Sequence, residues 1–329
     1  MTVTSSSAER VGPPPPFDPE LEAALTLVHG TRPASLTPDL IEAWRQGSAV
    51  NEPTDEELSR GGAFEAYERT VPGPAGAPDV TLLICRPVNA PAPTPVLYNI
   101  HGGGMVLGNR RMGLVDVLDM ALEAGAAVVS VEYRLAPEHP HPAPVEDCYA
   151  GLLWVADNTA ELNADPGRIV VVGTSAGGGL AAAVVLMARD RKGPALAGQM
   201  LLCPMLDDRN DTPSAVQMEG VGFWDRTSNE TGWTALLGDA RGGPDVSPYA
   251  APARATDLSG LPPAFIDVGS AETFRDEDVA YATAIWRAGG QAELHVWPGG
   301  FHGFAQLAPH AAVSQAAKAA RPAWLRRIL

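Results

Sequence analysis

The sequence predicts an α/β fold, in which a mostly parallel β-sheet is covered by helices on both faces. From about residue 95 onward, short apolar segments typical of buried strands alternate with longer segments typical of helices. Parallel strands need such crossover helices, so the alternation favours a parallel sheet between two helical layers. Two further strand-like segments, residues 64–71 and 80–86, flank a Pro- and Gly-rich turn at residues 72–76 and predict an antiparallel hairpin at one edge.

The sheet is expected to contain eight strands. Besides the hairpin, apolar segments predict strands at residues 96–100, 126–133, 168–172, 199–203, 264–268 and 294–297. Helices are predicted at residues 19–29, 38–46, 114–124, 144–158, 176–192, 276–288 and 312–328. Residues 205–250 interrupt the alternation: they are rich in Gly and Pro and predict one short helix, near residues 229–237.

The charge of the chain excludes several classes of partner. Its 23 basic and 39 acidic residues give a formal net charge of −16. Phosphate repels such a chain at long range, so neither nucleic acid nor an anionic membrane surface is expected as a partner. No run of apolar residues reaches the 18 or so needed to span a bilayer, so we expect no integral membrane association.

The cysteines and the N-terminal residues indicate a cytoplasmic protein. Cys85, Cys148 and Cys203 are few and odd in number, and they show no metal-ligand spacing, as expected for buried thiols in a reducing compartment. Residues 1–17 are rich in Ser and Pro and lack the apolar core of a signal peptide, so they are expected to form a disordered leader.

The segment Gly173-Thr174-Ser175-Ala176-Gly177 carries the first chemical signal. It lies between a predicted strand and a predicted helix, which is the context of the G-x-S-x-G nucleophile elbow. A sharp strand-to-helix turn forces the serine into a strained conformation, and small flanking residues let the chain pass closely. The sequence therefore predicts Ser175 as a nucleophile at the carboxyl end of the sheet.

A glycine-rich loop, His101-Gly102-Gly103-Gly104, follows the predicted strand at residues 96–100. Backbone N–H groups of glycines are not shielded by side chains. Those of Gly102 and Gly103, together with that of Ala176, are the expected donors of an oxyanion hole. His101 itself is expected to have a structural role in this loop.

The base is expected after the nucleophile, because this architecture orders its residues Ser, acid, His. That order leaves His295, His302 and His310. His295 lies within the last predicted strand, whereas His302 follows that strand on a Gly-rich loop at its carboxyl end, from which it can reach the elbow. We therefore predict His302 as the base.

The acid that orients the base is expected after the strand at residues 264–268. Four carboxylates follow it: Glu272, Asp276, Glu277 and Asp278. The last three are expected to open the next helix, where acidic residues interact favourably with the helix dipole. Glu272 lies nearest the strand end and is the favoured acid, with Asp276 as the alternative.

These motifs resemble those of the hormone-sensitive-lipase-like esterases, also called bacterial family IV, over residues 60–329. The loop at His101 is similar to that family's H-G-G-G, residues 133–138 read Y-R-L-A-P-E as in the family, and the elbow resembles its G-T-S-A-G branch. His302, in H-G-F, matches the family's base. When Arg275-Asp276-Glu277 is aligned with the end of the family's D-P-L-R-D-E motif, Glu272 stands in the place of its first Asp.

The resemblance implies an α/β-hydrolase fold with a helical cap built from residues 18–46 and 205–250, and a catalytic domain of residues 47–204 and 251–329. It also implies a carboxylesterase acting on small-molecule acyl esters of short to medium chain length through a Ser-His-Glu triad and an acyl-enzyme, without metal or organic cofactor. The same residues would suit an amidase, lactonase or deacetylase, and a binding protein on a hydrolase scaffold is a more remote alternative. A homodimer is an open alternative to a single copy.

Overall fold

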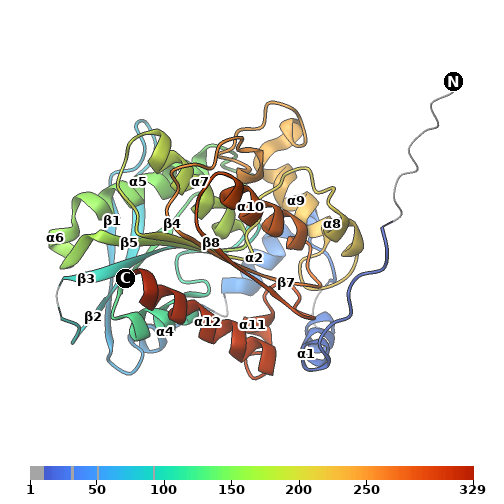
Figure 1. Ribbon diagram of the computed structural model, residues 1–329, viewed down its shortest axis with the longest axis horizontal. Coiled ribbons are helices and arrows are strands. Elements are labelled where there is room, and N and C mark those ends of the chain that lie inside the picture. The colour runs from blue at the N-terminus through green and yellow to red at the C-terminus, as the bar shows by residue number, and fades with distance from the viewer. Residues whose placement is uncertain (1–10, 31–32, 50–51, 92) are drawn as a thin grey trace.

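The computed structural model describes residues 11–30, 33–49, 52–91 and 93–329, which surround one eight-stranded sheet (Figure 1). Its strands are β1 (Phe64–Val71), β2 (Val80–Pro87), β3 (Thr94–Ile100), β4 (Ala127–Glu132), β5 (Ala164–Thr174), β6 (Gly198–Leu202), β7 (Ala264–Gly269) and β8 (Ala292–Trp297). They lie in the order β1-β2-β4-β3-β5-β6-β7-β8. β2 is antiparallel to β1 and to β4, and every other pair of neighbours is parallel. The predicted fold class, including the hairpin at one edge, is confirmed.

Helices cover both faces of the sheet, as predicted (Figure 1). One face packs against α4 (Leu114–Ala124) and α12 (Ala312–Ile328), and the other against α5 (Ala143–Asp157), α7 (Ala176–Asp190) and α10 (Arg275–Arg287). Alternate residues of the central strands serve the two layers: Tyr98 joins the core under α5 and α7, whereas its neighbour Leu97 joins the core under α4. All seven residues of β3 are buried, which explains its largely apolar sequence.

Several short elements were not predicted from the sequence. They are α3 (Asp55–Ser59), α6 (Thr159–Leu162), α8 (Pro213–Gln217), α11 (Phe304–Leu307) and the 3₁₀ turns η2 (Gly238–Ala240) and η3 (Pro252–Arg254), whereas the 3₁₀ turn η1 (Pro38–Leu40) forms the start of the helix predicted at residues 38–46. Each has five residues or fewer, so it completes too few turns for an apolar periodicity to show. The expectation of one helix in residues 205–250 is therefore wrong: α8 and α9 (Arg226–Leu237) both lie there.

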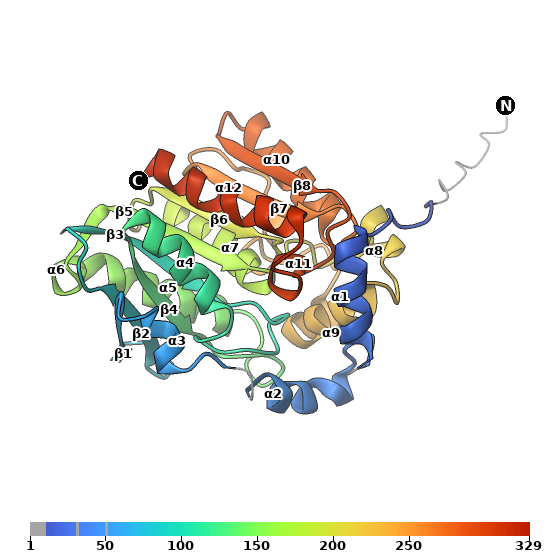
Figure 2. The same cartoon turned by 90° about the horizontal axis from the view of Figure 1, so that it is seen from below.

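Two helices, α1 (Pro19–His29) and α2 (Ile41–Ala49), come first in the chain. Leu21 and Leu25 of α1 pack with Phe301 and Phe304 beside α11 (Figure 2), and the link between α1 and α2 contacts residues 205–250. In the link between them, Ser35 Oγ donates to Asp225 Oδ2 at 2.7 Å and the Leu36 N–H donates to Ser228 Oγ at 2.8 Å. Residues 1–10 of the expected leader lie outside the described residues, and residues 11–17 contain no helix or strand.

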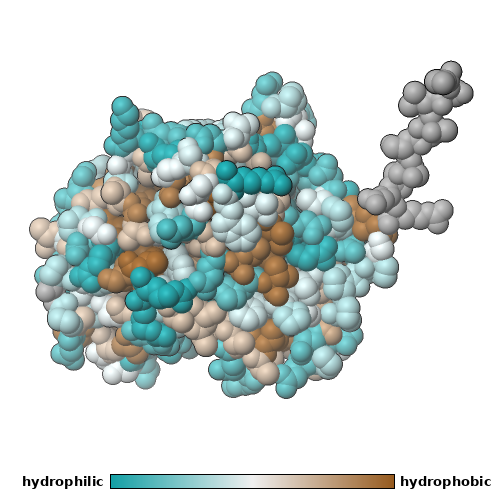
Figure 3. All heavy atoms as spheres, in the orientation of Figure 1, coloured by the Kyte–Doolittle hydropathy of each residue, from teal (hydrophilic) through white to brown (hydrophobic). Residues whose placement is uncertain are grey.

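Among the described residues, no helix combines the length and the apolar character that a bilayer crossing requires. On the face shown in Figure 3, hydrophilic and hydrophobic residues are interspersed.

Candidate active site

Ser175 lies in the turn that joins β5 to α7, with φ +59° and ψ −122°. This conformation is strained for any residue other than glycine. Backbone hydrogen bonds hold it: the Ser175 N–H donates to Leu202 O at 2.8 Å, and Ser175 O accepts from the Met205 N–H at 2.9 Å. The strand-turn-helix context expected for the elbow is thus present.

The glycines of the elbow are required by close backbone contacts. A Cβ on Gly177 would lie 2.1 Å from Ile100 O, and a Cβ on Gly173 would lie 2.1 Å from Gly177 O. Neither space accepts even a methyl group, so α7 packs directly against the end of β3.

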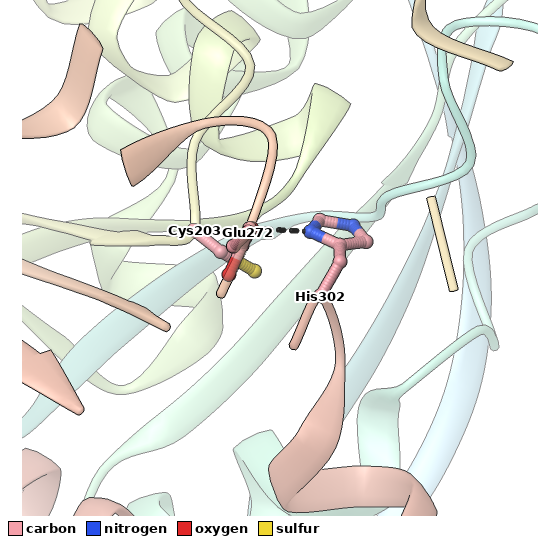
Figure 4. A group of neighbouring side chains, drawn as sticks. All are labelled: Cys203, Glu272 and His302. Carbon is pink, nitrogen blue, oxygen red and sulfur yellow. Dashed lines mark hydrogen bonds and ion pairs between the residues drawn. The ribbon is translucent and has the colours of Figure 1, made fainter. Parts of the chain in front are cut away.

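Three side chains predicted from the sequence meet at the carboxyl end of the sheet. His302 Nε2 lies 3.0 Å from Ser175 Oγ, and His302 Nδ1 lies 2.6 Å from Glu272 Oε1. Figure 4 shows the imidazole of His302 directed at the Glu272 carboxylate. The Gly269 N–H donates to the other carboxylate oxygen, Glu272 Oε2, at 3.0 Å. Ser175, His302 and Glu272 are only 5%, 7% and 1% exposed, so these hydrogen bonds are shielded from water.

The other three candidate acids make no hydrogen bond to His302 among the described residues. Asp276 accepts from the Ser214 N–H at 2.8 Å and from Arg275 Nε at 2.8 Å. Glu277 and Asp278 lie in the buried first turn of α10, where burial raises the pKa of each carboxyl well above its usual range. Of the four carboxylates, Glu272 is the one hydrogen bonded to His302 within the described chain.

The other histidines that follow the nucleophile lie away from Ser175. His295 stacks on Trp297 with ring centroids 5.0 Å apart and contacts Glu293 at 2.9 Å. His310 is exposed near the start of α12. The geometry therefore supports His302 as the base, although its catalytic role stays a prediction.

The glycine-rich loop at residues 101–104 lies beside the elbow. A Cβ added to Gly102 would be 3.3 Å from Ser175 Cβ, so the loop backbone passes against the nucleophile. Gly103 has a φ of +112°, which favours glycine. Ala176 is the first residue of α7, and its N–H is not needed for bonds within the helix. All three predicted oxyanion donors lie in segments that flank Ser175, and their role stays a prediction.

His101 has the structural position expected for it. Its ring is 2% exposed, stacks on Tyr133 with centroids 4.1 Å apart, and donates from Nδ1 to Gly102 O at 2.8 Å. Burial lowers the pKa of His101 to about 4. The imidazole is therefore neutral in neutral solution and supports the loop through its ring contacts.

His101 predicts a pH-dependent stability. Its pKa in the unfolded chain is about 6.5, above the folded value of about 4. As the pH falls from about 6.5 to about 4, His101 becomes protonated in the unfolded chain but stays neutral in the folded protein. The free energy of unfolding therefore declines by about 3 kcal/mol. Urea unfolding at several pH values should show a shallower decline for His101→Asn than for the parent. Parallel curves for the two proteins would contradict this account.

Cys203, Glu272 and His302 form a group whose ligand atoms lie within 4.8 Å of one another (Figure 4). The geometry fits a metal poorly. Two ligands of one tetrahedral ion are normally more than about 3 Å apart, whereas Glu272 Oε1 and His302 Nδ1 are separated by a hydrogen-bond distance of 2.6 Å. Burial also raises the pKa of the Cys203 thiol well above its usual range, which disfavours the thiolate that a metal needs.

Two aromatic residues beside the base were not predicted from the sequence. The Phe274 ring meets the His302 ring edge-on, with centroids 5.2 Å apart. The Trp224 ring lies 6.4 Å from His302, and a Cβ on Gly104 would be 2.3 Å from Trp224 Cη2. The indole thus packs on the glycine-rich loop next to the base. It comes from the irregular chain between α8 and α9, where no local pattern indicates such a contact.

Comparisons with known proteins identify the family of the chain. Residues 97–306 match a family model described as the alpha/beta hydrolase fold. The chain is 36% identical over 297 residues to the carboxylesterase NlhH of Mycobacterium tuberculosis. The aligned region covers 88% of this chain and 90% of the relative. It is 36% identical over 282 residues to the esterase LipI of the same organism, with 83% of this chain and 85% of the relative covered.

Solved structures show the same likeness. The bacterial heroin esterase superposes with a TM-score of 0.87 at 40% identity, covering 95% of this chain and 98% of that protein. The esterase LipW from Mycobacterium marinum superposes with a TM-score of 0.85 at 34% identity, covering 97% of this chain and 98% of LipW. On its fold, its motifs and these relatives, the chain belongs to the α/β hydrolase family, within the hormone-sensitive-lipase-like group.

Proposed function

We propose that the protein is a carboxylesterase whose catalytic triad is Ser175, His302 and Glu272. The observation that carries the proposal is the continuous chain of contacts from Ser175 Oγ to His302 Nε2 at 3.0 Å and from His302 Nδ1 to Glu272 Oε1 at 2.6 Å. Relatives named carboxylesterase, esterase and carboxylic ester hydrolase support the ester as the bond that is cleaved. Release of p-nitrophenol from p-nitrophenyl butyrate by the purified protein tests the activity.

In the proposed mechanism, His302 transfers a proton from Ser175 to the departing alcohol. Neutral His302 accepts the Ser175 hydroxyl proton at Nε2 as the oxygen attacks the ester carbonyl, while Glu272 accepts the hydrogen bond from Nδ1–H and stabilises the imidazolium. His302 then returns the proton to the departing alcohol, leaving an acyl-serine. Water attacks this ester in the same way and releases the carboxylic acid. The residues need no metal or organic cofactor for these steps.

We assign the stabilisation of the tetrahedral intermediate to the backbone N–H groups of Gly102, Gly103 and Ala176. The position of the loop against the elbow and the N-terminal end of α7 support this assignment. Such donors contribute about 3 kcal/mol each at the transition state, because they point at charge that develops only during the reaction.

We propose a helical cap made of residues 18–46 and 205–250, over a catalytic domain of residues 47–204 and 251–329, with residues 1–17 as a leader. Hydrogen bonds between the two cap segments support this division: Thr231 Oγ1 donates to Leu36 O at 2.8 Å, and His29 Nε2 lies 2.8 Å from Gly222 O. Trp224, from the second cap segment, brings the cap next to His302.

The cap is expected to limit the acyl chain that the site accepts, with butyryl to octanoyl esters preferred over long-chain triglycerides. Because the indole of Trp224 packs on Gly104 beside the base, Trp224→Ala should lengthen the accepted chain. Each additional buried methylene adds about 0.8 kcal/mol. If the space left by the indole buries about two more methylenes, the ratio of kcat/KM for decanoyl over butyryl ester should rise on the order of tenfold.

Trp224→Phe is the matched control for this prediction, since it keeps an aromatic wall and should change the ratio less. Kinetics on p-nitrophenyl esters from acetyl to palmitoyl measure the profile. A parent that prefers emulsified long-chain substrate, or a Trp224→Ala variant with the parent profile, would refute the role of the cap.

We further propose a cytoplasmic location and association as a homodimer. Cys85, Cys148 and Cys203 are free thiols, which fits a reducing compartment. Among the described residues, β8 pairs on one side alone, with β7, and Val296 on it is 40% exposed. Such an edge suits pairing with a second copy, and sedimentation velocity measures the association.

A further inference from the structure

One side chain of the N-terminal helices reaches the loop that follows β3. From α2, Arg45 Nε donates to Val106 O at 2.8 Å and Nη2 donates to Ala136 O at 2.9 Å. The same guanidinium binds both carboxylate oxygens of Glu138, at 2.7 and 2.8 Å. The Arg45 side chain is 22% exposed, so its head group lies mostly within these contacts.

The two carbonyls belong to the loops that support the proposed oxyanion hole. The Val106 N–H donates to Gly103 O at 3.1 Å and the Leu107 N–H donates to the same oxygen at 2.8 Å, which makes residues 103–107 one tight turn. The Ala136 N–H donates to Met105 O at 2.9 Å, so the neighbouring loop holds this turn from its other side.

Two contacts join these loops nearer to the nucleophile. His101 stacks on Tyr133, and Tyr133 Oη donates to His101 O at 2.9 Å. The two loops are therefore joined at two places: by His101 and Tyr133 near the nucleophile, and by Arg45 at Val106 and Ala136 farther from it. Since Gly103 lies between these two places, the direction of its N–H depends on both.

Arg45, in the first cap segment, also connects these two loops to the second cap segment, residues 205–250. The chain that leads into α2 is fixed to α9 by hydrogen bonds from the Leu36 N–H to Ser228 Oγ and from Thr231 Oγ1 to Leu36 O, both at 2.8 Å. Nine residues after Leu36, Arg45 binds the loop beside the oxyanion hole. The first cap segment is thus bonded at Leu36 to the second cap segment and at Arg45 to the loop.

We propose that Arg45 is a positioning residue that fixes the oxyanion loop in its productive orientation and couples that orientation to the N-terminal segment. The inference rests on the proposed esterase function. Surface ion pairs between an arginine and a glutamate contribute little to stability, and Glu138 is 55% exposed. The contacts of Arg45 with the two backbone carbonyls therefore carry the inference, since the planar guanidinium has enough donors to bind both carbonyls and the Glu138 carboxylate at once.

The test compares Arg45→Met and Arg45→Lys with the parent, and Arg191→Lys is the matched control. Arg191 also binds both oxygens of a glutamate, Glu146, at 2.6 and 3.0 Å, but it lies at the end of α7 away from the oxyanion loop. Four quantities are measured: kcat and KM on p-nitrophenyl butyrate, the affinity for an aliphatic trifluoromethyl ketone, and Tm. The ketone accepts the serine oxygen and forms an oxyanion, so its affinity reports on the oxyanion hole.

Arg45→Met should lower kcat about tenfold to a hundredfold, a part of the loss seen when an oxyanion donor is removed, and KM should change by less than about threefold. Affinity for the ketone should fall by a similar factor. Arg45→Lys should lie in between, because lysine keeps the charge opposite Glu138 but cannot bind both carbonyls. Arg191→Lys should retain the parent values.

Two results would overturn the inference while the parent is active. One is an Arg45→Met variant with the parent's kcat and ketone affinity. The other is an Arg45→Met variant that has a lower Tm or a higher KM but binds the ketone with the parent's affinity. A parent without activity on the ester would instead contradict the proposed esterase function.

Discussion

Replacing Ser175 by alanine should abolish the esterase activity, lowering kcat on the order of 10⁴-fold or more. The hydroxyl is the atom proposed to bond to the acyl carbon, and without it His302 can act only on water. The fold should survive, because alanine keeps the Cβ and the backbone bonds to Leu202 and Met205 that hold the strained turn. Rates with p-nitrophenyl butyrate, compared at equal protein concentration and matched circular dichroism, measure the loss.

Ser130→Ala is the matched control for this prediction. Ser130 is fully buried in β4 and accepts a hydrogen bond from Asn99 Nδ2 at 2.9 Å, so the same substitution removes one buried hydrogen bond at a distance from His302. Its expected effect is on stability, about 1–3 kcal/mol, with kcat near the parent value. Should Ser175→Ala keep activity within about tenfold of the parent, a nucleophilic role for this residue would be excluded.

Local motifs explain why the nucleophile and its loop were predictable. Gly173, Ser175 and Gly177 lie within five residues of one strand-turn-helix unit, and both glycines are required by backbone contacts, that of Gly173 within the unit and that of Gly177 with the end of β3. His302 and Glu272 were predictable for another reason: parallel strands end at one edge of the sheet, so residues that directly follow strands are brought together.

The contacts made by Arg45 and Trp224 lack such a local signal. Arg45 binds Val106, Ala136 and Glu138 across 61 to 93 positions of sequence, and nothing near it marks a partner. Trp224 follows α8 in an irregular stretch, where helical or strand periodicity cannot tell which way a side chain points. Both depend on how the N-terminal and cap segments pack over the sheet, which is a tertiary property.

Asp276 remained an alternative to Glu272 because the sequence did not fix where the next helix begins. Glu272 and Asp276 are one helical turn apart, and the sequence did not show whether the turn between them was helical. In the structure α10 begins at Arg275, with Phe274 as its N-cap. Asp276 therefore lies in the first helical turn, and Glu272 lies in the preceding loop beside His302.

Glu272→Gln is expected to lower kcat by roughly 10²–10⁴, by analogy with other triads whose acid was neutralised. The Gly269 N–H donates to Glu272 Oε2 at 3.0 Å, so the single oxygen of the amide will be retained there. Its NH₂ group then faces His302 Nδ1 and favours the tautomer protonated at Nε2. That tautomer presents a hydrogen to Ser175 Oγ and cannot accept the serine proton.

Asp276→Asn is the matched control, since it makes the same change four residues away. Asp276 binds the Ser214 N–H and Arg275, and an acid in a first helical turn is worth only about 0.3–1 kcal/mol of stability, so kcat should stay near the parent. Glu272→Asp should also be impaired, because a side chain one methylene shorter cannot reach both Gly269 and His302. Kinetics on folded variants at one mildly alkaline pH compare the three. If Asp276→Asn gives the deeper loss while Glu272→Gln stays near the parent, the acid is Asp276 and the proposed triad is wrong at that position.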